Sequence, residues 1–303
     1  MRAVRAVPDV LGWLLDPYAF EFMRRALAVL LIVSVVGAVV GAFVVHKGLA
    51  FSGDALAHAT LAGVAVAFVN GASVGLGALV AAVVTALGVG WMRRRTAVSY
   101  DTAIGILFVA MFSLGILVLS RRTAYTPDLL SFVFGNILGV SRADLVGALL
   151  MGAAVLLFVW AFYRELLFVA YDPAMAAASG VRSALFQYAL LVMIAVAVVV
   201  ALKAIGIVLV NALLIIPAAT AAMLSHRLSM IMLLGALIAA AVSAVGLHVS
   251  YYAGVAASPA IVLAACAAFA LAALVSARRG SARRSPAYAP PGATGVRSAP
   301  DGR

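Results

Sequence analysis

Asp54 and His58 are the two residues whose types and spacing best suit chemistry in this sequence. They open and close the segment Asp54-Ala-Leu-Ala-His58, which runs directly into a long stretch without formal charge. Residues four apart lie on one face of a helix about one turn from each other, and carboxylate oxygen and imidazole nitrogen both ligate first-row divalent metals. The pair therefore predicts a metal site. The competing interpretation is an Asp–His hydrogen bond, or a helix cap, that fixes packing.

Two further polar residues lie in or near apolar stretches and are weaker metal-site candidates. Asn211 precedes Pro217 in the segment VNALLIIPAATA, where it could line a polar path or make an interhelical hydrogen bond. His248 lies beside two tyrosines in GLHVSYY, where it could add a ligand or a gate, or simply pack at a span end. The sequence leaves these alternatives open.

Several classes of chemistry lack their motifs in this sequence. No G-x-x-x-x-G-K-[ST] segment occurs, so the chain encodes no nucleotide site of that kind. No H-E-x-x-H segment occurs, so nothing points positively to a zinc-dependent intramembrane hydrolase. The single cysteine, Cys266, excludes an internal disulfide and a cysteine-cluster metal site.

Composition places the candidate residues in a membrane protein. The 303 residues are 66% hydrophobic and 10% charged, with a mean hydropathy of +1.19, whereas soluble domains carry roughly 25% charged residues. A water-soluble enzyme and a disordered chain are both excluded. The net charge of +11 comes mainly from short Lys and Arg clusters between apolar runs and near the C-terminus. Such clusters are typical of membrane flanks and do not indicate binding of nucleic acid.

Long uncharged runs predict an all-α, polytopic transmembrane bundle of about eight or nine spans, because about twenty apolar residues cross a bilayer as a helix. The turn signal Asn70-Gly71 divides one overlong run, and Gly254 or Ser258-Pro259 divides another. These runs are far longer than the ~10-residue alternating segments of a membrane β-barrel. The expected spans are 26–45, 51–69, 72–92, 102–120, 145–163, 183–202, 204–225 and two within 228–277.

Three regions follow from this pattern. Residues 1–25 mix aromatic and charged side chains and predict an interfacial segment. Residues 26–277 form the transmembrane domain, and residues 278–303 predict a basic, disordered cytoplasmic tail. Basic clusters mark the cytoplasmic side of a membrane protein. In a nine-span bundle, one side would hold the basic clusters at Arg93–Arg95, at Arg227 and in the tail. The arginines near the N-terminus would lie on the other side, which leaves the N-terminal topology open.

The loop at about residues 172–181 predicts a short cytoplasmic helix. Asp172-Pro173 is a helix start, with a capping residue followed by proline at the first helical position, and Gly180 is a typical helix end. The helix would present small residues, which suits insertion into a groove of a partner protein. The alternative is an ordinary connecting helix.

Six blocks of the sequence resemble the membrane subunit of the zinc/manganese/iron-type ATP-binding-cassette importers. They occur in the family's order and span nearly the whole chain, from Arg24 to about residue 275. The blocks are GLAFSGDALAHATLAGVAVAF (48–68), YDTAIGILF (100–108), LLSFVFGNILGVS (129–141), YDPAMAAASGV (171–181), KAIGIVLVNALLIIPAATA (203–221) and SYYAGVAASPAIVL (250–263).

The resemblance implies a helical bundle like that of the vitamin-B12 and siderophore importers, in a bacterial cytoplasmic membrane. It implies a permease that pairs with a second permease subunit, identical or paralogous. It also implies cytoplasmic ATP-binding-cassette ATPases and an extracytoplasmic metal-binding protein as partners. Asp54 and His58 would form the translocation site. The coupling helix that contacts the ATPase would include Asp172, Ala176, Ala177 and Gly180.

The expected function is therefore the permease subunit of an ATP-driven divalent-metal importer, with the metal as cargo and no permanently bound cofactor. Manganese is favoured, zinc comes next and iron third. Two copies of the Asp54/His58 pair could supply a roughly octahedral site for Mn²⁺ or a tetrahedral N₂O₂ site for Zn²⁺. The alternatives are a proton-coupled or channel-type metal carrier in which Asp54 titrates, and an intramembrane metal-dependent enzyme.

Overall fold

The computed structural model describes residues 16–120, 135 and 137–282, and in these residues every regular element is helical. Nine of the helices are long and apolar enough to cross a membrane, which confirms the all-α, polytopic prediction for this part of the chain. The elements are η1 (Asp16–Ala19), α2 (Glu21–His46), α3 (Ala50–Val69), α4 (Val74–Arg95), α5 (Tyr100–Ser120), η2 (Ile137–Gly139), α7 (Arg142–Ala161), α8 (Tyr163–Tyr171), α9 (Pro173–Ala178), α10 (Ser183–Ile205), α11 (Ile207–Leu224), α12 (Leu228–Ala253) and α13 (Ala257–Ala282).

The breaks between spans lie at the turn signals of the sequence. Gly71 has φ +68° in the turn between α3 and α4, and Gly254 has φ +65° at the end of α12, where a residue with a side chain would be strained. Ser258 and Pro259 belong instead to the first turn of α13. The long run 228–277 is therefore divided at Gly254.

The N-terminal boundary differs from the prediction. Helix α2 begins at Glu21, before the expected start at residue 26. Its first turns can include charged residues because Glu21 pairs with both Arg25 and Arg142. Of the predicted interfacial segment 1–25, residues 1–15 lie outside the described residues. So do Arg121, Arg122 and residues 283–303 of the predicted tail.

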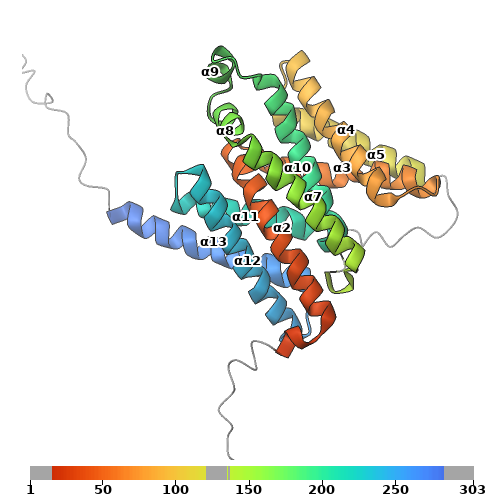
Figure 1. The fold of residues 1–303 in the computed structure, drawn as a ribbon, viewed down its shortest axis with the longest axis vertical. Helices are drawn as coiled ribbons and strands as arrows, with labels where there is room; N and C mark the ends of the chain where they lie inside the picture. Colours follow the sequence, from red (N-terminus) through yellow and green to blue (C-terminus); the bar gives the residue numbers. More distant parts are fainter. Residues whose placement is uncertain (1–15, 121–134, 136, 283–303) are drawn as a thin grey trace, which may run out of the picture.

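Helix α2 runs through the middle of the bundle, with α12, α11, α7 and α10 packed against it (Figure 1). Helices α3, α4 and α5 form a second group, which joins the first through α10 and α11. Helix α11 therefore contacts both α2 and α3. This arrangement brings residues of α11 next to the helix that carries Asp54 and His58.

Glycines allow α2 to lie directly on the backbone of α11. A Cβ atom at Gly37 would lie 3.3 Å from the carbonyl oxygen of Leu213, and one at Gly41 would collide with the carbonyl oxygen of Leu214. Pro217 lies inside α11 and has no N–H for the carbonyl of Leu213. The close approach of α2 thus coincides with the part of α11 whose hydrogen-bond ladder is interrupted.

The two ends of the bundle differ in the helices that they contain. Figure 1 shows α9 at one end and the start of α2 at the other. At the α9 end, the guanidinium groups of Arg93 and Arg94 lie over the rings of Tyr100 and Tyr188, at 5.0 and 6.0 Å. At the opposite end, Arg142 donates to Glu21 at 2.9 Å. The basic-cluster rule predicts that the α9 end is the cytoplasmic one.

Candidate functional site

Asp54 and His58 lie on one face of α3, as their spacing predicts. The Nε2 atom of His58 is 3.7 Å from Oδ1 of Asp54. The two side chains are only partly covered: 42% of Asp54 and 28% of His58 remain exposed, while most of their neighbours on α3 are buried. The pair therefore faces outward from a single copy of the chain, and further donors could approach it from that side.

Asn211 of α11 is hydrogen-bonded to the Asp54 carboxylate of this pair. Its Nδ2 atom donates a hydrogen bond of 2.7 Å to Oδ1 of Asp54, across 157 residues of sequence. Its own Oδ1 atom is buried and has no hydrogen-bond partner among the described residues. Such a buried, unsatisfied oxygen is costly, and it leaves an acceptor beside the Asp54 carboxylate.

Gly53 makes room for this contact between α3 and α11. A Cβ atom at position 53 would lie 2.9 Å from Oδ1 of Asn211 and 3.0 Å from Cδ2 of Leu214. Real Cβ atoms essentially never approach other atoms so closely, so a side chain there would displace Asn211 or Leu214. The glycine directly before Asp54 thus leaves room for the Asn211 amide beside Asp54.

Two phenylalanines of α5 line the side of His58. The imidazole ring lies 5.7 Å from the ring of Phe108 and 5.9 Å, edge-on, from that of Phe112. Phe51, one turn before Asp54, also contacts Phe108 edge-on at 6.4 Å. The His58 ring thus packs against two aromatic side chains of α5, on a helix neighbouring α3.

The described residues contain no group of three or more His, Cys, Asp or Glu side chains that could hold a metal ion. Among the described residues, one copy therefore offers three side chains, the carboxylate of Asp54, the imidazole of His58 and the amide of Asn211, whereas Zn²⁺ sites usually hold four ligands and Mn²⁺ or Ca²⁺ sites more. Cys266 is exposed on α13, which does not pack against α3.

The structure does not bring His248 into this group. His248 lies on α12, which packs on α2, α11 and α13 and not on α3. Its Nδ1 atom is 3.1 Å from the hydroxyl of Tyr18 and 2.9 Å from the carbonyl oxygen of Ala244, and the Tyr18 and His248 rings meet edge-on at 5.2 Å. Burial raises the pKa of the Tyr18 phenol. These contacts match the packing interpretation of His248.

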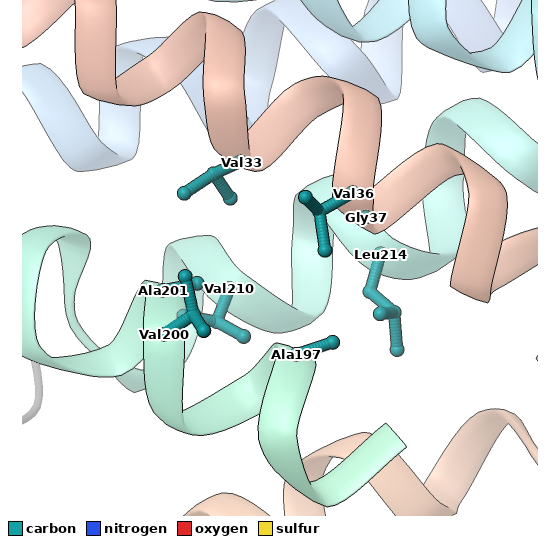
Figure 2. Close-up of a pocket in the computed structure, with 8 residues that line it drawn as sticks. All are labelled: Val33, Val36, Gly37, Ala197, Val200, Ala201, Val210 and Leu214. Atoms are coloured by element: carbon teal, nitrogen blue, oxygen red, sulfur yellow. The ribbon is translucent and has the colours of Figure 1, made fainter. Parts of the chain in front are cut away.

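A small pocket near Asn211 is entirely apolar and does not extend the site. It has a volume of about 10 Å³, room for about one water molecule, and the side chains that surround it carry no polar atom (Figure 2). The lining residues come from α2, α10 and α11. They are Val33, Val36, Gly37, Ala197, Val200, Ala201, Val210 and Leu214. An ion would find no side-chain ligand in this pocket.

The predicted cytoplasmic helix is α9, and its ends lie where the sequence places them. Oδ1 of Asp172 accepts hydrogen bonds from the backbone N–H groups of Ala174 and Met175, at 3.0 and 2.9 Å, as an N-cap does. Gly180 follows the helix with φ +85°. Ala176 is completely buried, whereas Ala177 is exposed and Met175 is 56% exposed. Ala176 thus anchors α9 to its own chain, and the outer face belongs to Met175 and Ala177.

Sequence reasoning missed a hollow beside α9. It has a volume of about 740 Å³ and opens to the surface at the α9 end of the bundle. Arg94 from α4 and Arg182 before α10 line it together with Ala177 and Tyr188. The Arg93–Arg95 run was recognisable only as a membrane flank, because its place beside α9 depends on how α4 packs against α10.

The fold and the site together define a polytopic membrane protein with a carboxylate–imidazole pair on one of its spans. The chain belongs to the ABC 3 transport family, whose pattern matches residues 19–276. The chain is 39% identical to the manganese transport system membrane protein MntC of Halalkalibacterium halodurans, over 86% of this chain and 90% of that protein. It is 32% identical to a membrane protein of Haemophilus influenzae named for an iron transport system, over 86% and 96% of the two chains.

Solved structures show the same fold. PsaBC from Streptococcus pneumoniae, determined in complex with Fab, superposes with a TM-score of 0.76 at 33% identity and covers 87% of this chain and 95% of that one. A protein described as a metal-chelate type ABC transporter, in an inward-facing conformation, gives a TM-score of 0.68 at 13% identity, over 90% and 91% of the chains. The chain is thus a multi-pass permease of the cytoplasmic membrane with the fold of the ABC metal importers.

Proposed function

We propose that this chain is the translocating subunit of an importer for a divalent transition-metal ion, with Asp54 and His58 as the ion site. Manganese is the favoured cargo, zinc comes next and iron third. The observation that carries the proposal is the Asp54–His58 pair itself. A carboxylate and an imidazole lie 3.7 Å apart on a membrane-spanning helix, partly exposed and held by Asn211. Ionisable groups at such a place usually mark an ion path.

A second copy of the chain would complete the ligand set. Moving an ion into an apolar medium costs tens of kcal/mol by Born solvation unless ligands replace its water. Two facing pairs would supply up to four carboxylate oxygens and two imidazole nitrogens, and the amide oxygens of two Asn211 side chains lie close by. Oxygen-rich donor sets suit Mn²⁺, while one oxygen from each Asp54 would give the N₂O₂ set of Zn²⁺. The manganese name of the Halalkalibacterium relative favours the first arrangement, and the iron name of the Haemophilus relative keeps iron as a third cargo.

The ATPase that powers the importer is a separate subunit and docks at α9. Met175 and Ala177 present a small apolar surface, and Arg94 and Arg182 line the adjoining hollow. A partner with an apolar groove and acidic side chains would fit this surface. An extracytoplasmic metal-binding protein delivers the ion at the opposite end of the bundle. The importer itself holds no permanent cofactor.

Reconstitution with the partner ATPase tests the proposal. Liposomes that contain both subunits should accumulate radioactive Mn²⁺ only when ATP is supplied. Excess Zn²⁺ should compete better than excess Fe²⁺. Uptake that follows a proton gradient without ATP would support the carrier alternative and contradict the proposal. Uptake that dissipates a metal gradient in both directions would support the channel alternative.

A matched pair of variants separates docking from folding at α9. Gly180→Trp would strain the turn, because its φ of +85° disfavours any side chain. Ala177→Trp is the cleaner change, since Ala177 is exposed and helical. We expect Ala177→Trp to insert normally and to lose the ATPase on co-purification. The control is Leu237→Trp at an exposed position of α12, and this variant should retain the ATPase. An Ala177→Trp permease that keeps both the ATPase and uptake would refute docking at α9.

A further inference from the structure

A lysine at the turn between α2 and α3 contacts the helix that precedes α9. Lys47 donates a hydrogen bond of 3.1 Å from its Nζ atom to the carbonyl oxygen of Val169. Val169 belongs to the last turn of α8, whose final carbonyls have no partner within the helix. Cations are favoured at this end of a helix because the helix dipole is negative there. Lys47 thus caps α8 from a distant part of the chain.

An aromatic contact joins the same two segments beside this bond. The ring of His46, the last residue of α2, lies 4.2 Å from the ring of Tyr171, the last residue of α8. Asp172, which caps α9, follows Tyr171 directly. The end of α8 is therefore held by two neighbouring side chains at the point where the chain turns into α9.

The ammonium of Lys47 is drawn partly out of water to make this bond. Its side chain is half-buried, and burial lowers the pKa of the ammonium. Partial desolvation of a cation is unfavourable unless a hydrogen bond compensates it, and the Val169 carbonyl supplies that bond. Lys47 is therefore held in a specific contact at this end of the bundle, whereas most surface lysines extend into solvent.

The other side of the turn leads directly to the ion site. Gly48 has φ +66°, and Leu49 behind it is buried. Ser52 donates from Oγ to the carbonyl of Leu49 at 2.6 Å, which ties the turn to the first turn of α3. Asp54 lies in the next turn of that helix. A shift of α8 would therefore reach Asp54 through a short turn and a continuous helix.

We infer that Lys47 is a positioning residue that couples movement of α8 and α9 to the α3 helix that carries Asp54 and His58. The inference rests on the proposed function, in which the ATPase pushes on α9 and the ion is held by α3. Lys47 touches neither the ion site nor the outer face of α9. Its role is to make the two move together.

The test measures Mn²⁺ uptake and ATP hydrolysis in the same liposomes, so that their ratio can be compared. Lys47→Met keeps the unbranched stem and removes the ammonium, and Lys47→Arg keeps a cation. The control is Arg227→Met, which removes a cation before α12 at the same end of the bundle. Equilibrium binding of Mn²⁺ without ATP and co-purification of the ATPase are measured for each variant.

We expect Lys47→Met to bind Mn²⁺ and the ATPase as the wild type does, but to lose about tenfold in uptake per ATP, within the range typical of coupling between sites. Lys47→Arg should recover most of the ratio, and Arg227→Met should leave it unchanged. A wild-type ratio in Lys47→Met would overturn the inference. So would a fall in uptake matched by an equal loss of Mn²⁺ binding, since Lys47 would then only support the fold.

A second variant decides the matter if Lys47→Met fails to insert. Lys47→Gln shortens the side chain and removes the ammonium that bonds to the Val169 carbonyl. It should also lower uptake per ATP while Mn²⁺ binding persists, and an unchanged ratio would overturn the inference. Failure of the wild-type complex to take up Mn²⁺ with ATP would instead overturn the proposed function, and the inference with it.

Discussion

At the scale of single residues, the proposed ion site consists of three side chains in contact, of which the sequence alone predicts two as partners. Asp54 and His58 are four residues apart in an uncharged stretch, so any helix would place them on one face. The bond from Asn211 to Asp54 links residues 157 positions apart and exists because α3 packs on α11 at Gly53. The spacing of the two residues along the chain does not predict that contact. His248 shows the converse, because its residue type suits a metal but its helix lies elsewhere.

The role of Asn211 can be tested by removing its amide. Asn211→Leu keeps a similar volume and leaves Asp54 without its hydrogen-bond donor. Groups that orient a metal ligand typically change affinity or activity by about 10–100-fold when they are mutated. We expect a loss of Mn²⁺ uptake in that range, with normal insertion, measured as radiometal uptake per inserted permease.

Thr220→Val is the matched control on the same helix. Thr220 is buried and donates only to the carbonyl of Ile216 within α11, at 2.7 Å. Its loss should leave uptake nearly unchanged. Equal effects of the two substitutions would mean that Asn211 matters only for the packing of α11.

At the scale of helices, the sequence predicts most spans closely because length without charge is a strong signal in a bilayer. The start of α2 could not be predicted in this way, since Glu21 pairs with Arg25 in the same helix and with Arg142 of α7. The ends of α9 follow from Asp172 and Gly180. The burial of Ala176 does not, because which face of so short a helix turns inward is decided by tertiary packing.

Close packing of α2 on α11 gives a prediction about stability. Gly41→Ala would place a Cβ against the carbonyl of Leu214, and overpacking of this kind typically costs about 1–3 kcal/mol. We expect less folded permease and a lower melting temperature in detergent. Gly147→Ala in α7, where a Cβ meets nothing within 4 Å, should be neutral or stabilising. A stable Gly41→Ala variant would contradict the described contact.

The cap of α9 gives a second prediction at this scale. Asp172→Ala removes the acceptor for two backbone N–H groups, and loss of an N-cap typically costs ~1 kcal/mol, which is large for a helix of six residues. We expect weaker binding of the ATPase with normal membrane insertion. Ser141→Ala removes the N-cap of α7 at the opposite end and should leave ATPase binding intact. Equal loss in both variants would show a general effect on folding.

At the scale of the whole molecule, one chain presents the Asp54–His58 pair on a partly exposed face of α3, which would be half of the proposed ion site. Sequence resemblance implies that permeases of this kind act in pairs, and the shortage of donors within the described residues agrees with that expectation. Which surfaces of two copies meet is a property of the assembly, and neither the hydrophobicity pattern nor a single chain determines it. The exposed side chains of α5 and α13 face either lipid or a partner.

A tandem fusion of two permease copies tests whether the site is shared. If each ion is bound by residues of both copies, then Asp54→Asn in one copy alone should reduce uptake far below half of the wild-type value. The measurement is Mn²⁺ uptake per fusion protein. Uptake close to half would show that each copy carries ions independently, which would contradict a shared site.

The proposed ion site is the central claim about this permease, and one measurement tests it most directly. Radiometal uptake, divided by the amount of membrane-inserted permease, should be compared for wild type, Asp54→Asn and His58→Leu. Both variants keep roughly the original side-chain volume and remove one donor, and the described part of α3 offers no other carboxylate to replace Asp54. We predict that both insert, retain the ATPase and lose Mn²⁺ uptake almost completely. Near-wild-type uptake per molecule in Asp54→Asn would remove the pair from the ion path and contradict the account.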